Sequence, residues 1–297
     1  MFLGAGISKD AKIPTWDNLV SDLLVSLMSN KLSDYEINLT ENQEKFIVQN
    51  LKTMNGESPL LQARYIRSGL EDVFLDLTNE ILYKNCINSS SLLEEISRLC
   101  LPVRNGTGVR SVVTYNFDDL LEYNFEKLGI KYRSIYRESD IPTKNELGIY
   151  HVHGFLPRNR EDYENISESL LVFSEEEYHN LMLDSYNWSN LIQLNYLREN
   201  TCLMIGLSVT DPNLRRLLDI AMRKQEDSDL CKHYVILKMK SISEKAKKKG
   251  DLDVDNIEKF DLVNRKLQEE FFKELGLNVI WVEEHKEIPE IIAKIYG

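Results

Sequence analysis

MFLGAGISKDAKIPTWDNL, residues 1–19, leads from three apolar residues through a glycine turn into a helical pattern. Glycines at positions 4 and 6 allow the backbone to turn tightly and to approach a phosphate group, which the start of a helix also favours. The dinucleotide fingerprint, however, has a third glycine three residues after the second, and this chain has Lys9 there. The stretch alone is therefore equally typical of a nucleotide loop and of a plain strand-to-helix turn. A buried strand averages about five residues, so we expect the native chain to begin before Met1.

The totals are those of an ordinary globular chain of 297 residues, 42% hydrophobic and 28% charged, which suits one large domain or two modest ones. The formal net charge of −12 disfavours nucleic acid and anionic membranes as partners. The sequence has no apolar run of membrane-spanning length and no signal peptide. Its four cysteines form no C-x-x-C pair, so neither a cysteine zinc site nor a disulfide scaffold is expected. We expect a cytoplasmic protein.

The hydrophobic pattern changes along the chain. Residues 17–103 are helical in pattern, beginning with apolar residues at helical spacing from Leu19 to Leu27, and Thr15 or Asp17 is the expected N-cap. From residue 109 on, short apolar or β-branched runs alternate with helical stretches at 118–128, 174–198, 212–223 and 257–275. Such alternation predicts an α/β fold, a Rossmann-like parallel sheet with helices on both faces and a helical insert or layer at 17–103.

Ligands of such sheets bind outside the carboxyl ends of the strands, so the polar residues there are the candidates for a site. The run ending in TYNFDD places Asn116 at the strand end, followed by Asp118 and Asp119. Asn and Asp are also good helix caps, and this alternative stays open for them.

The run LGIYHVHG brings His151 and His153 onto one face of a strand, with His153 nearest the carboxyl end. A histidine there can take up a proton near neutral pH. Two histidines at this spacing could bind a metal, but the sequence offers no evident third ligand. We expect His151, the inner one, to be buried and hydrogen-bonded.

A fourth strand ends in GLSVTDPN, residues 206–213, where Gly206 and Ser208 form a second loop of small residues. Ser208 could bind a phosphate or a ribose, or be an ordinary turn serine, while Asp211 and Pro212 read as an N-cap and N1 pair. The sequence contains neither a P-loop nor a serine-hydrolase elbow.

Taken in order, GAGIS at 4–8, IPTW at 13–16, TYNFDD at 114–119, HVHG at 151–154 and GLSVTDPN at 206–213 resemble the sirtuin superfamily over nearly the whole chain. The resemblance implies that the first glycine loop holds the NAD diphosphate and that the second loop contacts the adenosine side. It also implies that Asn116 and Asp118 surround the nicotinamide ribose and carboxamide, and that His153 is the catalytic base. The implied NAD-binding residues are Gly4, Ala5, Gly6, Ser8, Trp16, Asp118, Gly206 and Ser208, with Trp16 in a loop that closes over the site.

Two departures narrow the resemblance. Protein-deacylating sirtuins have a zinc ribbon of two C-x-x-C pairs, which this chain lacks, and an arginine where it has Asp17. In both respects the sequence is similar to the sirtuin-like NAD-hydrolase domains of bacterial anti-phage defence proteins. That likeness implies a single catalytic domain, residues 1–297, which uses NAD as substrate and holds no metal.

The same likeness implies an antiviral effector that depletes NAD when infection is sensed. Such domains are usually restrained in homo-oligomers, or by a regulatory partner such as a hexameric ATPase or a phage-sensing domain or protein. Two alternatives remain at this stage: an NAD-dependent protein deacylase, and a non-catalytic assembly module that binds NAD or ADP-ribose.

Overall fold

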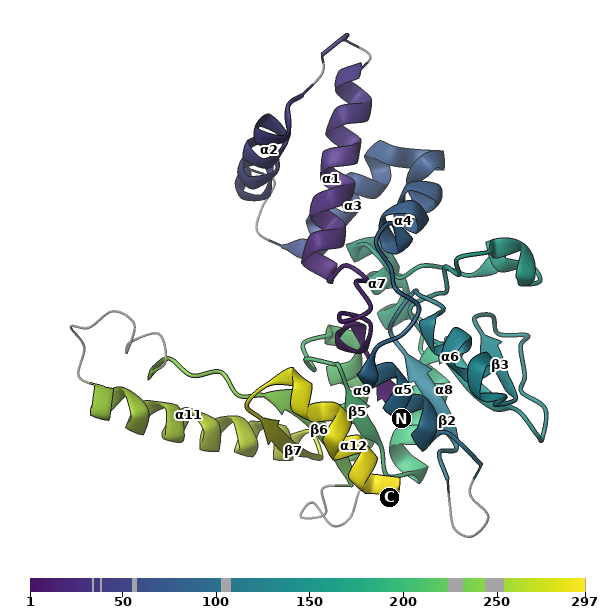
Figure 1. The fold of residues 1–297 in the computed structure, drawn as a ribbon, viewed down its shortest axis with the longest axis vertical. Helices are drawn as coiled ribbons and strands as arrows, with labels where there is room; N and C mark the ends of the chain where they lie inside the picture. Colours follow the sequence, from purple (N-terminus) through teal and green to yellow (C-terminus); the bar gives the residue numbers. More distant parts are fainter. Residues whose placement is uncertain are drawn as a thin grey trace.

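One parallel sheet forms the centre of the computed structural model, which describes residues 1–33, 35–37, 39–54, 58–102, 108–223, 232–243 and 254–296 (Figure 1). Seven strands of these residues pair side by side in the order β3-β4-β2-β1-β5-β6-β7. The strands are β1 (Phe2–Leu3), β2 (Ser111–Thr114), β3 (Tyr132–Ile135), β4 (Leu147–His151), β5 (Leu203–Ile205), β6 (His233–Lys238) and β7 (Leu277–Val282). The prediction of an α/β, Rossmann-like fold is therefore confirmed.

Helices cover both faces of this sheet, which is why its strands read as nearly continuous apolar runs. Neighbouring residues of a strand face opposite ways, so Leu3 packs into one hydrophobic core and Phe2 into the other. The first core also contains residues of α5 (Ser91–Leu99), α6 (Leu120–Leu128) and α12 (Ile288–Tyr296). The second contains residues of α8 (Trp188–Glu199), α9 (Pro212–Met222) and α11 (Val254–Glu274).

A group of helices stands apart from the sheet, at the top of Figure 1. It consists of α1 (Trp16–Ser33), α2 (Glu41–Met54), α3 (Pro59–Leu70) and α4 (Phe74–Tyr83). Because α1 follows the carboxyl end of β1 through residues 4–15, the group lies at that edge of the sheet. An ion pair of 3.1 Å between Arg67 Nε and Glu177 Oε1 joins α3 to α7 (Glu175–Leu183). Within the predicted helical stretch 17–103, α5 differs because it packs on α6 and α12 against the sheet.

Three elements differ from the sequence-based expectations. The single helix predicted at 174–198 is wrong, because α7 ends at Leu183 and α8 begins at Trp188. Asn190 stabilises the break by donating from Nδ2 to the carbonyl oxygen of Leu181 at 2.7 Å. Strand β3 was not predicted, since it is an edge strand with half-exposed, polar residues. Helix α12 was not predicted either, although its isoleucines recur at helical spacing.

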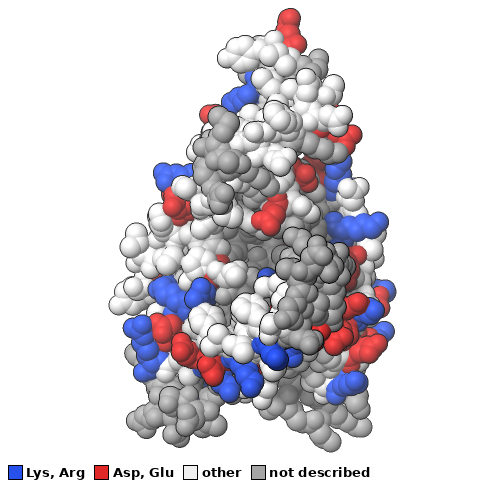
Figure 2. All heavy atoms as spheres, turned by 90° about the vertical axis from the view of Figure 1, so that its left-hand side faces the viewer, with Lys and Arg blue, Asp and Glu red and all other residues white. Residues whose placement is uncertain are grey.

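Charges of both signs are mixed on the surface. Figure 2 shows Lys and Arg side chains interspersed with Asp and Glu side chains over the described residues of the face on the left-hand side of Figure 1. The described residues of this face therefore form no broad cationic surface of the kind that binds nucleic acid. Among the described residues, no helix combines the length and the hydropathy that crossing a membrane requires.

Candidate functional site

Two loops meet in the middle of the sheet, where the strand order reverses between β1 and β5. The amide of Gly4 donates to the carbonyl oxygen of Ile205, and the amide of Gly6 donates to that of Gly206, both at 3.0 Å. This is the topological switch point, the place where sheets of this class bind ligands. The structure thus brings together the two glycine loops that the sequence separates.

The glycines of these loops are needed for the loops to touch. A Cβ on Gly6 would lie 2.8 Å from the Cα of Gly206, and Gly206 itself has a φ of +69°. In addition, the amides of Gly6, Ile7 and Ser8 already donate to protein carbonyl oxygens. Close packing therefore accounts for the glycines without a ligand, and the diphosphate cradle stays a prediction.

Replacing Gly206 with alanine is expected to lower the free energy of unfolding by about 2–5 kcal/mol, from backbone strain and overpacking together. The added Cβ would lie 2.7 Å from the backbone nitrogen of Ile7, which cannot move cheaply. Gly129 is the matched control, because its φ is +67° and no atom lies within 4 Å of its added Cβ. Gly129→Ala should cost only about 1–2 kcal/mol. Urea unfolding of both variants measures the difference, and equal losses would contradict the clash.

A chain of hydrogen bonds joins the first loop to the residues that follow β2. Asn116 donates from Nδ2 to Ser8 Oγ at 3.0 Å, and Ser8 Oγ donates to Asp118 Oδ1 at 3.2 Å. The amide of Leu120 donates to the same carboxylate oxygen at 3.2 Å. All three polar side chains are buried. The predicted residues Ser8, Asn116 and Asp118 thus form one connected cluster.

The direction of this chain fixes what Asn116 offers to a ligand. A hydroxyl has one proton, and Ser8 gives it to Asp118, so Ser8 can only accept from Asn116. Asn116 must therefore turn its amide nitrogen to Ser8. Its Oδ1 is then left buried without a hydrogen-bond partner, as an acceptor for a hydroxyl group or a water molecule.

Burial raises the pKa of Asp118 from 3.8 to about 6, although the hydrogen bonds from Ser8 and Leu120 lower it. A folded-state pKa above the unfolded value means that stability is fully present below 3.8 and is lost as the pH rises through 6. The ionised carboxylate at neutral pH therefore makes the fold less stable than it would be with a neutral group.

Asp118→Asn is accordingly expected to raise the free energy of unfolding by about 1–3 kcal/mol near pH 8. The amide keeps an oxygen to accept from Ser8 and Leu120 without the cost of a buried charge. The gain should shrink as the pH falls through 6 and vanish below 3.8. Urea unfolding from about pH 4 to 8 measures it. A variant that is less stable than the wild type near pH 8 would refute the conclusion that the buried charge of Asp118 destabilises the fold.

His153 follows the adjacent strand, β4, and is also buried. Its ring contacts Tyr115 edge-on at 4.5 Å between centroids and Tyr178 at 5.5 Å. Its Nε2 lies 3.7 Å from Asp211 Oδ2, too far for a hydrogen bond, and has no other partner. Burial lowers the pKa of His153 and the Asp211 charge partly offsets this, so the imidazole is neutral at pH 7. It can therefore accept a proton.

His151 has the structural role that the sequence predicted for it. It is buried, and its Nε2 lies 2.7 Å from Glu122 Oε1. The prediction of a hydrogen-bonded core histidine is confirmed.

Other predicted residues lie further from this cluster. Trp16 is the first residue of α1 rather than part of a loop, with Thr15 before it as one of the two expected caps, and its ring packs on Phe173 at 4.7 Å. Ser208 is exposed and shares a hydrogen bond of 2.6 Å with Thr210, as a turn serine does. Ala5 is exposed beside Gly6.

Sequence reasoning missed two neighbours of His153. Asp211 caps α9 as predicted, its Oδ1 accepting from the amide of Leu214 at 2.7 Å. Its Oδ2 also accepts from the hydroxyl of Tyr178 at 2.5 Å and faces His153. The capping pattern gave no signal for this second contact, because Tyr178 comes from a different helix.

A pocket of about 1020 Å³ adjoins the cluster, between the end of β4 and helices α7 and α8. Val152 and Gly154, on either side of His153, line it, whereas the described lining residues do not include Asn116 or His153 itself. The pocket therefore borders the predicted site without containing its two predicted catalytic side chains. Among the described residues, no three His, Cys, Asp or Glu side chains gather as metal ligands would.

Comparison with known proteins adds a family and a relative. A family model described as a SIR2-like domain matches residues 110–260, which include Asn116, Asp118, His153 and Gly206. The chain is also similar to a curated protein named NAD(+) hydrolase ThsA, from Enterococcus faecium, with 25% identity over 303 residues. That match covers 99% of this chain and 54% of the relative, so the chain spans about half the length of the curated protein it matches.

Proposed function

The chain belongs to the SIR2-like domain family. We therefore propose that it is an NAD glycohydrolase, which cleaves NAD to nicotinamide and ADP-ribose. The similarity to a protein named as an NAD(+) hydrolase over 99% of the chain supports the choice of reaction. The proposed domain is the whole chain, residues 1–297, with its helical insert.

One observation carries the proposal. Asn116 Oδ1 and His153 Nε2 are both buried and have no hydrogen-bond partner in the structure. An unpaired buried polar atom costs about 1–3 kcal/mol, so native proteins keep few of them, often at sites that a ligand completes. Here the two atoms follow neighbouring strands at the ligand-binding edge of the sheet.

The chemistry needs an acceptor and a base at these places. The bond between nicotinamide and the ribose breaks, its electron pair goes to the departing ring nitrogen, and a water oxygen bonds to the ribose carbon. In our proposal Asn116 Oδ1 accepts from the ribose or the water and so positions them. His153 Nε2 takes the proton from the water or from a ribose hydroxyl, and Asp118 holds the carboxamide.

The decisive experiment incubates the purified chain with NAD and separates the products by chromatography, with candidate partners present and absent. Free ADP-ribose and nicotinamide support the proposal. The pocket beside His153 favours a protein deacylase as the second candidate. Such an enzyme would give O-acyl-ADP-ribose when an acylated peptide is added. Tight binding of NAD or ADP-ribose without turnover, with partners as well as alone, would point to a non-catalytic assembly module.

We further propose that the enzyme is a cytoplasmic antiviral effector. Uncontrolled NAD cleavage harms the cell that makes the enzyme, so a restraint is needed. Assembly into a homo-oligomer, or association with a hexameric ATPase or a phage-sensing domain or protein, would supply it. Expression in bacteria tests the role: cells with the active protein should lose NAD and limit phage yield only after infection, and an Asn116→Ala variant should do neither.

A further inference from the structure

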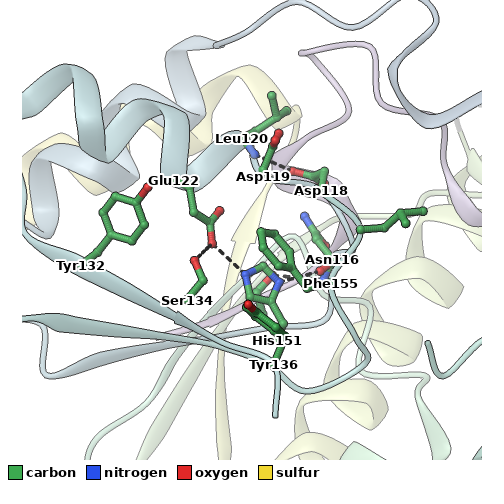
Figure 3. Close-up of polar contacts among 12 residues, drawn as sticks. Asn116, Asp118, Asp119, Leu120, Glu122, Tyr132, Ser134, Tyr136, His151 and Phe155 are labelled. Carbon is green, nitrogen blue, oxygen red and sulfur yellow. Dashed lines mark hydrogen bonds and ion pairs between the residues drawn. The ribbon is translucent and has the colours of Figure 1, made fainter. Parts of the chain in front are cut away.

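A buried histidine–glutamate pair lies next to Asn116 (Figure 3). His151 Nε2 and Glu122 Oε1 are 2.7 Å apart, and the two side chains are 1% and 2% exposed. The other ring nitrogen, Nδ1, lies 3.3 Å from the main-chain carbonyl oxygen of Asn116. We propose that this pair is a positioning device that holds Asn116 in its working orientation. The inference rests on the proposed function, since it concerns the same site.

The two contacts determine how many protons the pair holds. A carbonyl oxygen only accepts, so Nδ1 of His151 must carry a hydrogen to bond Asn116. One more proton must lie between Nε2 and Glu122 Oε1, on either atom. The pair therefore holds two protons, as imidazolium with carboxylate or as imidazole with carboxylic acid. Both forms have no net charge, which suits two side chains that are almost completely buried.

The proton shared between His151 and Glu122 decides whether Nδ1 carries the hydrogen that bonds Asn116. With only one proton on the pair, the neutral ring would place it between Nε2 and Glu122, and the lone pair of Nδ1 would then repel the carbonyl oxygen of Asn116. Figure 3 shows how the pair is held, with Glu122 on α6, His151 on β4 and Ser134 on β3. Ser134 Oγ donates to Glu122 Oε1 at 2.8 Å, and Phe155 packs on the imidazole at 4.0 Å between ring centroids.

The contact matters because Asn116 has few other anchors. Its amide donates to Thr114 Oγ1 at 3.1 Å and its Nδ2 donates to Ser8 Oγ at 3.0 Å. The bond from His151 is the third anchor, and it fixes the plane of the peptide group that follows Asn116. The bond thereby restrains the backbone at Asn116, from which the side chain with its unpaired Oδ1 projects.

Two substitutions of His151 test its contacts with Asn116 and with Glu122 separately. The amide nitrogen of Asn falls near Nδ1 of histidine, and that of Gln falls near Nε2. His151→Asn keeps a donor for Asn116 and loses Glu122, whereas His151→Gln does the reverse. We expect His151→Gln to lower kcat for NAD cleavage about 10–100-fold with KM changed less than about three-fold. His151→Asn should stay within about five-fold of the wild type.

His233 supplies the matched control for the loss of a buried imidazole. It is 1% exposed, and its Nδ1 accepts from the amide of Cys202 at 3.2 Å. It is the first residue of β6 and so lies at the amino ends of the parallel strands, whereas the candidate site lies at their carboxyl ends. His233→Asn and His233→Gln should therefore leave kcat unchanged even where they lower the melting temperature. Equal losses of kcat in the two His151 variants, or similar losses in the His233 variants, would overturn the positioning role.

A spectroscopic readout tests the pair apart from activity. In protein labelled with ¹⁵N-histidine, long-range ¹H–¹⁵N correlation identifies the protonated nitrogens of the five histidines, and His151→Gln assigns the signal by its loss. We expect a hydrogen on Nδ1 of His151 in the wild type, and also in Glu122→Gln, whose amide can donate to Nε2.

These results also separate the two proposals. A neutral His151 with its hydrogen on Nε2 alone would refute the positioning pair even in an active hydrolase. A protein that has the Nδ1 hydrogen but leaves NAD intact, with its partners present, would refute the proposed function and leave the pair in place.

Discussion

Asn116→Ala is expected to reduce NAD cleavage by about 10³-fold or more, because it removes the buried acceptor that positions the ribose and the water in the proposed mechanism. Its Oδ1 has no partner in the structure, so the interaction that the fold itself loses is the hydrogen bond from Nδ2 to Ser8. Asn116→Asp should be nearly as inactive. A carboxylate cannot donate to Ser8, whose only proton goes to Asp118. NAD consumption under saturating substrate measures both variants.

The control for Asn116 is another buried asparagine. Asn124 lies on α6 and donates from Nδ2 to the carbonyl oxygens of Asn88 and Leu120 at 3.1 and 2.7 Å. Asn124→Ala should lower the free energy of unfolding by about 1–3 kcal/mol and leave kcat within about three-fold of the wild type. Full activity of Asn116→Ala, with an unchanged circular dichroism spectrum, would remove Asn116 from the mechanism.

His153→Ala is expected to lower kcat by about 10²–10⁴-fold, the usual contribution of a general base. The direction of the pKa shift sets the pH profile. A base acts when unprotonated, and burial lowers the pKa of His153 below its ordinary value of 6.5. The rate should therefore be constant from about pH 8 to 6.5 and fall only below that range. Stopped assays from about pH 8 to about pH 5 with wild type and variant measure the profile.

A carboxyl group contributes to the same acid limb as His153. In the proposed mechanism Asp118 accepts from the carboxamide more strongly when it is ionised, and its pKa of about 6 would make the rate fall near that pH. In Asp118→Asn this contribution disappears, and what remains of the acid limb reports His153. The exposed His179 on α7 is the control, since His179→Ala should change neither the rate nor the profile. A variant without His153 that keeps the wild-type rate would exclude it as the base.

The sequence predicted those elements whose hydrophobic pattern is visible within the element itself. Continuous apolar runs with a polar residue at the break located β2 and β4, and hence Asn116 and His153. It could not predict β3, because the residues of this edge strand are half-exposed and polar and so form no apolar run. It could not predict the break between α7 and α8 either, because the helical periodicity continues across it. Local pattern says nothing of partners that come from other elements. Glu122 with His151 and Tyr178 with Asp211 are such pairs.

The first glycine loop illustrates the same limit. From GAGIS alone a tight turn and a phosphate loop were equally plausible. The structure adds that Gly6 touches Gly206 at the end of a distant strand, and that the amides of Gly6, Ile7 and Ser8 already donate to carbonyl oxygens within the protein. Whether a glycine is there for a neighbour or for a ligand depends on tertiary contacts, which a turn motif does not encode.

The place of β1 at the centre of the sheet has a consequence for biosynthesis. Phe2 pairs with Val113 on one side and with Met204 on the other, so β1 cannot be enclosed in the sheet until β5 has been synthesised. Contacts so distant along the chain form slowly, since closing long loops costs entropy before the contacts stabilise them. Truncated or stalled chains that end before β5 would lack the second loop and could not assemble the crevice. Translation itself would thereby delay the appearance of the proposed activity until β5 has been synthesised.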